Sequence, residues 1–187
     1  VSMGGQVVIA GQPGDKCGAD LAARIHYLEN LPQNLGQVRF YNTFVNKEMG
    51  VLIQGGGDFF VITSKFEPCG LTDIEAAWLG TIPVTKKTGG LGKVKNSFTY
   101  EWNNPNDVYG EIITLRNKLT EVAIFYAHDQ DNFKKMRING MKENFSWDIA
   151  LSRYYENYRT AALYKICKKI QEEVDQGKIS LLAAKEK

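Results

Sequence analysis

Short apolar runs alternate with segments of helical periodicity along the first half of this chain. Each run ends in glycine or polar residues, which is typical of strands buried in a parallel sheet. We expect strands at 6–11, 38–41, 59–62 and 82–85, and helices at 21–31, 47–53 and 71–79. This alternation predicts an α/β fold, a Rossmann-like parallel sheet with helices on both faces.

The pattern changes after residue 92, where helical periodicity takes over. Residues 98–102 suggest a short extended piece, residues 103–107 are rich in turn formers, and helices are expected at 108–126, 132–144 and 147–173. The sequence shows no internal repeat and no long flexible linker. We therefore predict one domain over 1–187, with a sheet core over about 1–95 and a helical part over about 106–187.

Composition narrows the class of protein. The chain has 187 residues, of which 43% are apolar and 24% charged, as expected for a globular domain with its own core. The formal net charge of +2 gives no electrostatic case for nucleic acid as a partner. No apolar run is long enough to span a bilayer, and no targeting segment is visible at the start, so we expect no membrane partner.

Cysteine and histidine are too few and too scattered for a metal site. The three cysteines, Cys17, Cys69 and Cys167, form no Cys-x-x-Cys pair, and only His26 and His128 could add ring nitrogens. Free thiols in a reducing compartment are the expected state. A nucleophile built from Cys69 is disfavoured, because neither histidine lies in a supporting motif.

The most informative segment is the turn at residues 67–71, Glu-Pro-Cys-Gly-Leu, which is followed by Glu75. It lies between the strand 59–62 and the helix that begins near Gly70. The first N–H groups of a helix lack internal partners and favour an anion such as phosphate, and Gly70 allows a ligand close to the backbone. Two carboxylates beside such a turn suit a ligand with phosphates and hydroxyls, such as a nucleotide sugar. The competing interpretation is an ordinary loop in which Glu67 and Glu75 are solvated.

Several motifs around this turn resemble, in order, those of bacterial glycogen synthases and plant starch synthases. Residues 64–72 (SKFEPCGLT) are similar to the family's SRFEPCGL signature. Residues 80–84 (GTIPV), 88–91 (TGGL) and 145–147 (FSW) are similar to three further family elements. The resemblance covers roughly residues 5–160, and several motifs in the right order are more specific than any one alone.

This resemblance implies the C-terminal half of a GT-B fold and a retaining glucosyltransferase. Such enzymes transfer glucose from ADP-glucose or UDP-glucose to the non-reducing end of an α-1,4-glucan, without a metal or other cofactor. The acceptor would lie against a separate N-terminal domain. The resemblance also implies a cytoplasmic or plastid location, and it leaves the choice between the ADP and UDP donors open.

The resemblance also assigns roles to residues. Glu67 would be the catalytic-site carboxylate that contacts the donor glucose hydroxyls, and Glu75 would reach the ribose. The backbone around the turn would hold the sugar and the distal phosphate, through Cys69, Gly70, Leu71 and Thr72. The loop Thr88, Gly89 and Gly90 would close the pocket beside the diphosphate.

Two departures from the family pattern affect these expectations. Lys86 and Lys87 stand where Arg or His usually precedes TGGL, and they either neutralise phosphate or are merely exposed. The family also has a strand-helix unit, carrying a phosphate-binding Arg and Lys, just before the strand matched by residues 7–11. In a Rossmann order of 3-2-1-4-5-6 that strand is the central one. Without it we expect two unpaired strand edges, or pairing with another copy or chain, and little or no transferase activity from this polypeptide alone.

Two other functions compete with this one. A non-catalytic relative would keep the fold as a sugar- or nucleotide-binding interaction module. A different nucleotide-binding module, such as an oxidoreductase, would use the glycine-rich loop 11–18, but that loop lacks the G-x-G-x-x-G spacing. On the last expected helix we predict that Tyr154, Tyr155 and Tyr158 pack, and an apolar face without its partner there is a second reason to expect self-association.

Overall fold

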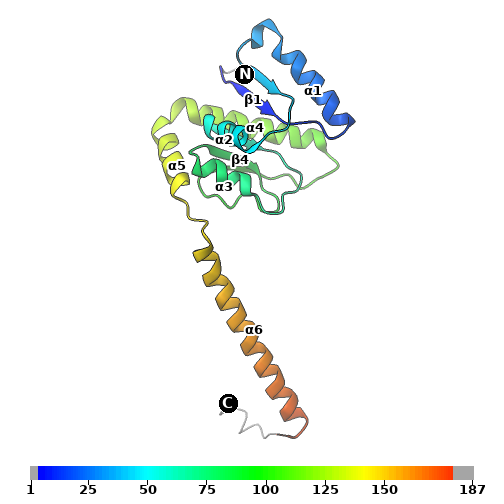
Figure 1. The fold of residues 1–187 in the computed structure, drawn as a ribbon, viewed down its shortest axis with the longest axis vertical. Coiled ribbons are helices and arrows are strands. Elements are labelled where there is room, and N and C mark those ends of the chain that lie inside the picture. Colours follow the sequence, from blue (N-terminus) through cyan, green and yellow to red (C-terminus); the bar gives the residue numbers. More distant parts are fainter. Residues whose placement is uncertain (1–3, 179–187) are drawn as a thin grey trace. The chain divides into compact units, whose positions relative to one another are not determined.

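The computed structural model describes residues 4–178, which form two compact units that meet between Glu143 and Asn144. The first unit contains, in chain order, β1 (Val7–Ala10), α1 (Lys16–Glu29), a 3-10 turn (Pro32–Asn34), β2 (Val38–Tyr41), α2 (Lys47–Gly56), β3 (Phe59–Ile62), α3 (Leu71–Trp78), β4 (Ile82–Lys86), β5 (Phe98–Tyr100), α4 (Val108–His128) and α5 (Gln130–Lys142) (Figure 1). The second unit contains α6 (Trp147–Asp175). The predicted single domain and its internal boundaries stay predictions.

The strands and helices agree closely with the sequence pattern, and the main differences lie at helix ends. Helix α1 begins earlier than expected because the Asp15 side chain caps it, accepting a hydrogen bond from Gly18 N at 2.7 Å. Helix α2 continues to Gly56, three residues beyond the end expected at residue 53. Of the extended piece expected at 98–102, residues 98–100 form a strand, β5, which pairs in parallel with β4.

The strands form two parallel sheets, β1–β2 and β3–β4–β5. In the Rossmann order 3-2-1-4-5-6, these correspond to strands 2-3 and strands 4-5-6. No strand of the described residues pairs with the second edge of β1 or of β3. Within the described residues both edges are unpaired, which is one of the two arrangements expected from the sequence; the other, pairing with another copy or chain, stays a prediction. Val8 of β1 and Val61 of β3 are 53% and 43% exposed.

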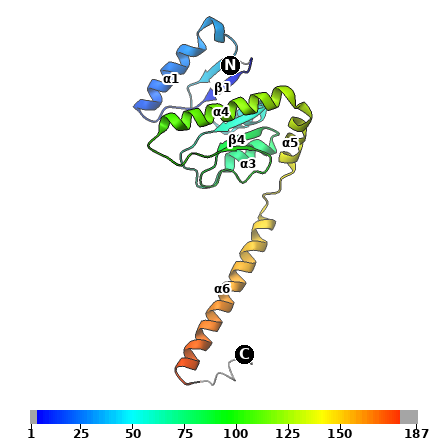
Figure 2. The ribbon, with the colours of Figure 1, turned by 180° about the vertical axis from the view of Figure 1, so that it is seen from behind.

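The core lies around β4, whose residues are all buried between its two neighbouring strands. Helix α4 crosses this sheet on the side seen in Figure 2, and α2 and α3 lie on the side seen in Figure 1. Aromatic contacts, edge-to-face except for the tilted pair Phe59–Phe133, join the sheet, α4 and α5, with ring centroids 4.9–6.3 Å apart. These rings belong to Phe59, Phe98, Phe125, Tyr126 and Phe133. Helices thus cover both faces, as predicted.

Glu143, at the end of α5, fixes the segment that follows β4. Its carboxylate accepts hydrogen bonds from Lys95 N at 3.0 Å and from Asn96 N at 2.8 Å. Its backbone carbonyl accepts one from Trp78 Nε1 at 2.9 Å, at the end of α3. Glu143 therefore joins α3 and α5 to the segment between β4 and β5.

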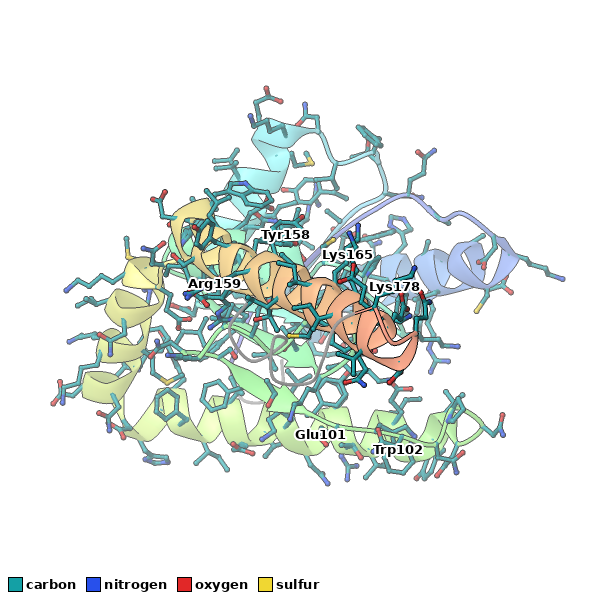
Figure 3. All side chains as sticks on the ribbon, turned by 90° about the horizontal axis from the view of Figure 1, so that it is seen from below. Glu101, Trp102, Tyr158, Arg159, Lys165 and Lys178 are labelled. Carbon is teal, nitrogen blue, oxygen red and sulfur yellow. The ribbon has the colours of Figure 1, made fainter. Side chains whose placement is uncertain are left out.

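Helix α6, considered by itself, exposes nearly all of its side chains. We expected Tyr154, Tyr155 and Tyr158 to be packed, but they are 50%, 71% and 71% exposed, and Tyr154 stacks on Tyr158 with centroids 6.3 Å apart. Figure 3 shows the side chains of Tyr158, Arg159 and Lys165 on this helix. Among the described residues, no helix combines the length and the apolar character needed to cross a membrane.

The aromatic core makes a direct stability prediction. Phe133 is 3% exposed and contacts Phe59 and Tyr126, so Phe133→Ala should lower the free energy of unfolding by about 3–5 kcal/mol. Phe44→Ala is the matched control, because Phe44 is 76% exposed and its loss should change stability by less than about 0.5 kcal/mol. Urea unfolding followed by circular dichroism measures both; equal effects would mean that the cluster is not part of the core.

Candidate functional site

The candidate site begins where β3 ends and the chain turns into α3. Gly70 is the N-cap of α3 and has φ 62°, a left-handed conformation that favours glycine. Helices α1, α2, α4 and α5 each begin with an Asp or Asn side chain that accepts a backbone N–H, whereas no side chain of the described residues caps the start of α3 or of α6. The first N–H groups of α3 therefore remain available to an acceptor from outside the helix.

A second loop, after β4, lies directly on this turn. Gly90 N donates a hydrogen bond to the carbonyl of Glu67 at 2.7 Å, and Thr88 Oγ1 donates to the carbonyl of Lys65 at 3.2 Å. A Cβ added at Gly70 would lie 2.7 Å from the Gly90 carbonyl oxygen, and one at Gly89 or Gly90 would overlap the carbonyl of Glu67 or Cys69. The two loops pack backbone against backbone, so all three positions require glycine.

The two candidate carboxylates have different surroundings. Glu67 is half-buried, and its Oε1 accepts a hydrogen bond from Gly70 N at 3.4 Å, which holds the carboxylate beside the turn. Glu75 is exposed one turn into α3, where its Oε2 accepts from Gln54 Nε2 of α2 at 3.3 Å. The contacts thus join Glu67 to the turn and place Glu75 toward α2.

The remaining predicted residues divide between the loop contact and the helix start. Gly70, Thr88, Gly89 and Gly90 are brought together with Glu67 by the contacts of the two loops. Cys69 takes part through its backbone, and its thiol is exposed. Leu71 and Thr72 lie exposed at the start of α3, where their backbone N–H groups belong to the uncapped end.

Both lysines before the second loop have carboxylate partners. Lys86 is 8% exposed and its Nζ lies 2.6 Å from Glu111 Oε1 of α4. Lys87 is exposed, and its hydrogen bond with Glu101, at 2.8 Å, raises the pKa of the lysine. The open question from the sequence is answered for Lys86, because it is a buried ion pair rather than an exposed charge.

Sequence reasoning missed a further charged pair at this site. Asp73, in the first turn of α3, is fully buried, and Lys93 Nζ lies 3.6 Å from its Oδ1. Burial raises the pKa of the Asp73 carboxyl, and the positive charge of Lys93 opposes that rise. The available signal was one acidic residue just after Gly70 and one basic residue just after TGGL, but only the fold shows that they meet.

Comparison with solved structures identifies the fold. The chain superposes on the catalytic domain of starch synthase IV from Arabidopsis thaliana bound to ADP and acarbose, with a TM-score of 0.67 and 24% identity, over 85% of this chain and 33% of that one. It also superposes on sucrose-phosphate synthase from Thermosynechococcus elongatus, with a TM-score of 0.52 and 22% identity, over 86% of this chain and 39% of that one. The fold is therefore that of the C-terminal part of GT-B enzymes, as predicted.

Comparison with curated proteins identifies the family. The chain is 32% identical to a glycogen synthase of Treponema denticola over 137 residues, which cover 72% of this chain and 28% of that protein. It is 30% identical to a glycogen synthase of Aliivibrio fischeri over 163 residues, which cover 83% of this chain and 31% of that protein. The chain belongs to the glycogen and starch synthase family. It spans less than a third of the length of these two synthases, and no family model matches it.

A separate cavity lies outside the two loops of the candidate site. It has a volume of about 580 Å³ and lies between α1 and β2, beside Ala22, His26 and Phe40. Its main charged groups already satisfy each other, because the Glu29 carboxylate lies 3.0 Å from Arg39 Nη1 and 3.5 Å from His26 Nδ1. No residue of the motifs at 64–72, 80–84, 88–91 and 145–147 lines it.

Alanine substitutions at a glycine of the loop contact and at a glycine outside it should have opposite effects on stability. Gly90→Ala should lower the free energy of unfolding by about 1–3 kcal/mol, because its Cβ would overlap the Cys69 carbonyl. Gly56→Ala, in the last turn of α2, has no atom within 4 Å of the new Cβ and should raise stability by up to about 1 kcal/mol. Urea unfolding of the two variants measures both values, and a neutral Gly90→Ala would disprove the close approach.

Proposed function

We propose that this chain is the donor-binding part of a retaining glucosyltransferase of the starch and glycogen synthase type. It would bind ADP-glucose or UDP-glucose, and the complete enzyme would transfer the glucose to the non-reducing end of an α-1,4-glucan. The observation that carries the proposal is the uncapped start of α3, which lies beside the Glu67 carboxylate and is held by a glycine loop.

The geometry supports a different binding group for each part of the donor. The diphosphate would accept hydrogen bonds from Leu71 and Thr72 N–H at the positive end of α3. The Glu67 carboxylate would accept from glucose hydroxyls and set the orientation of the ring. Glu75, one turn into the helix, would reach the ribose. As the glycosidic bond to phosphate breaks, the leaving diphosphate gains charge, which fixed N–H dipoles stabilise without reorganisation.

One solved structure bears on the identity of the nucleotide. The Arabidopsis neighbour was solved with ADP, which is the part of ADP-glucose that remains after the glucose has been transferred. This supports an adenine nucleotide, while uracil donors stay in the proposal. No metal or other cofactor is required by it. In the described residues, no group of three or more metal-binding side chains is placed to share an ion.

Catalysis would need parts that other residues supply. Lys86 and Lys87 are paired with Glu111 and Glu101, so cations for the donor phosphates would come from elsewhere in the complete protein. The unpaired edges of β1 and β3 suit a further parallel strand, from another segment, a separate chain or a second copy. The α-glucan acceptor would lie on a further domain, and we expect little transferase activity from these residues alone.

The alternative is a non-catalytic sugar- or nucleotide-binding module. The observation that favours it is the same pairing of Lys86 and Lys87, which leaves both lysines engaged away from a phosphate. Such a module would bind the donor through Glu67 and α3 in the same manner. It would differ by showing no glucose transfer even in the full-length protein.

The test is calorimetric titration with ADP-glucose, UDP-glucose and ADP. Wild type should bind one nucleotide sugar more tightly than the free nucleotide. Glu67→Ala should lower the affinity for that nucleotide sugar by about tenfold or more and leave the affinity for ADP unchanged. Glu156→Ala, on the exposed face of α6, is the matched control and should bind as wild type. Equal affinity of the wild type for ADP-glucose, UDP-glucose and ADP, or an unchanged Glu67→Ala, would contradict the assigned role of Glu67.

A further inference from the structure

The ammonium group of Lys93 lies where the two site loops meet. Its Nζ donates hydrogen bonds to the carbonyl oxygens of Gly70 at 2.6 Å and Gly90 at 2.7 Å, and also to that of Cys69. An ammonium group has three N–H donors, so these three carbonyls use all of them. Lys93 therefore joins the turn before α3 to the loop after β4.

The same group also balances a buried charge. Asp73 is fully buried and its Oδ1 lies 3.6 Å from Lys93 Nζ, farther than any of the three carbonyl oxygens. The carboxylate thus acts on Lys93 through its charge, and the direct hydrogen bonds go to the backbone. A cation beside the start of a helix is unfavourable to the helix dipole, and the acidic Asp73 in the first turn offsets this.

We propose that Lys93 is a positioning residue of the donor site, which holds Gly70 and Gly90 in the arrangement that aims the N–H groups of α3 at the donor. Its side chain is 34% exposed, and each of its three hydrogen bonds to a carbonyl is charge-assisted. The lysine also offsets three carbonyl dipoles that would otherwise repel a nearby diphosphate. The part of this inference that concerns the donor rests on the proposed function; the part that concerns the loops does not.

Two roles of Lys93 can be separated by a double substitution. Lys93→Met keeps a long side chain but removes the charge, so the buried Asp73 carboxylate keeps only its hydrogen bond from Ile74 N and loses its counter-charge. The variant should therefore have a lower unfolding temperature. Combining it with Asp73→Asn removes the unpaired charge and should restore most of that loss. If Lys93 positions the loops, the double variant should still lack the loop order, because the three carbonyls have lost their donor.

Loop order is measured by amide hydrogen exchange, without any nucleotide. In Lys93→Met and in the double variant, the Gly90 N–H, which bonds to the Glu67 carbonyl, should exchange about tenfold or more faster. Affinity for the bound nucleotide sugar should fall by about tenfold or more in both. Lys95→Met, at an exposed lysine of the same segment, should change neither quantity.

Chemical rescue separates the role of the three N–H donors of Lys93 from the role of its charge. In Lys93→Ala, added ethylammonium has three N–H donors for the three carbonyls and should restore the slow exchange of Gly90 N–H. Tetramethylammonium has the same charge without an N–H and should not. Rescue by both ions would show that only charge matters and would overturn the positioning role.

The outcomes separate this inference from the proposed function. Unchanged Gly90 exchange in Lys93→Met, or full recovery of exchange in the double variant, would overturn the role of Lys93 in the loops. If the wild type binds no nucleotide sugar, the proposed function fails, and with it the role of Lys93 in donor binding. The exchange results would still decide whether Lys93 orders the two loops. Should Lys93→Met alone fail to fold, the double variant and the rescue of Lys93→Ala carry the same test.

Discussion

The candidate site depends on one close contact, the backbone-to-backbone packing of the turn before α3 on the loop after β4. Gly70, Gly89 and Gly90 make it sterically allowed, and the hydrogen bond from Gly90 N to the Glu67 carbonyl holds it. Each loop follows a strand of the same sheet, and parallel strands end at the same edge. The sheet therefore brings the two loops together, and their glycines allow the last few ångströms of approach.

The polar groups around this contact explain why it is rigid as well as close. Lys93 satisfies three carbonyls that the loops leave open, Asp73 balances the lysine, and Glu143 anchors the chain just beyond. Hydrogen-bonded polar groups of this kind favour one arrangement of the chain, although Asp73 Oδ2 itself accepts no hydrogen bond. A preorganised set of N–H donors can then stabilise negative charge without first being ordered, which is what transfer from a sugar nucleotide requires.

Sequence reasoning found the local features and missed those made by tertiary contacts. The strands 38–41 and 59–62 were predicted to the residue, because each apolar run is bounded by polar or glycine residues. The motif resemblance assigned Gly70, Gly89 and Gly90 to the donor site, and these donor-binding roles stay predictions. The close packing of the two loops at these glycines was not predicted. The ion pair of Lys86 with Glu111 and the contacts of Lys93 were not predictable, because each joins residues far apart in sequence whose spacing carries no periodic signal. The exposure of Tyr154 was missed for a related reason: helical spacing of aromatic residues does not say what they pack against.

The measurement that tests the central claim most directly is a map of backbone amide shifts in ¹⁵N-labelled chain as ADP-glucose or UDP-glucose is added. The account predicts that the largest shifts fall on Gly70, Leu71 and Thr72 at the start of α3, with Gly89 and Gly90 on the facing loop. Shifts that cluster instead around Ala22 and Phe40, at the cavity between α1 and β2, would contradict it. They would place the nucleotide where the glycine loops have no part in its binding.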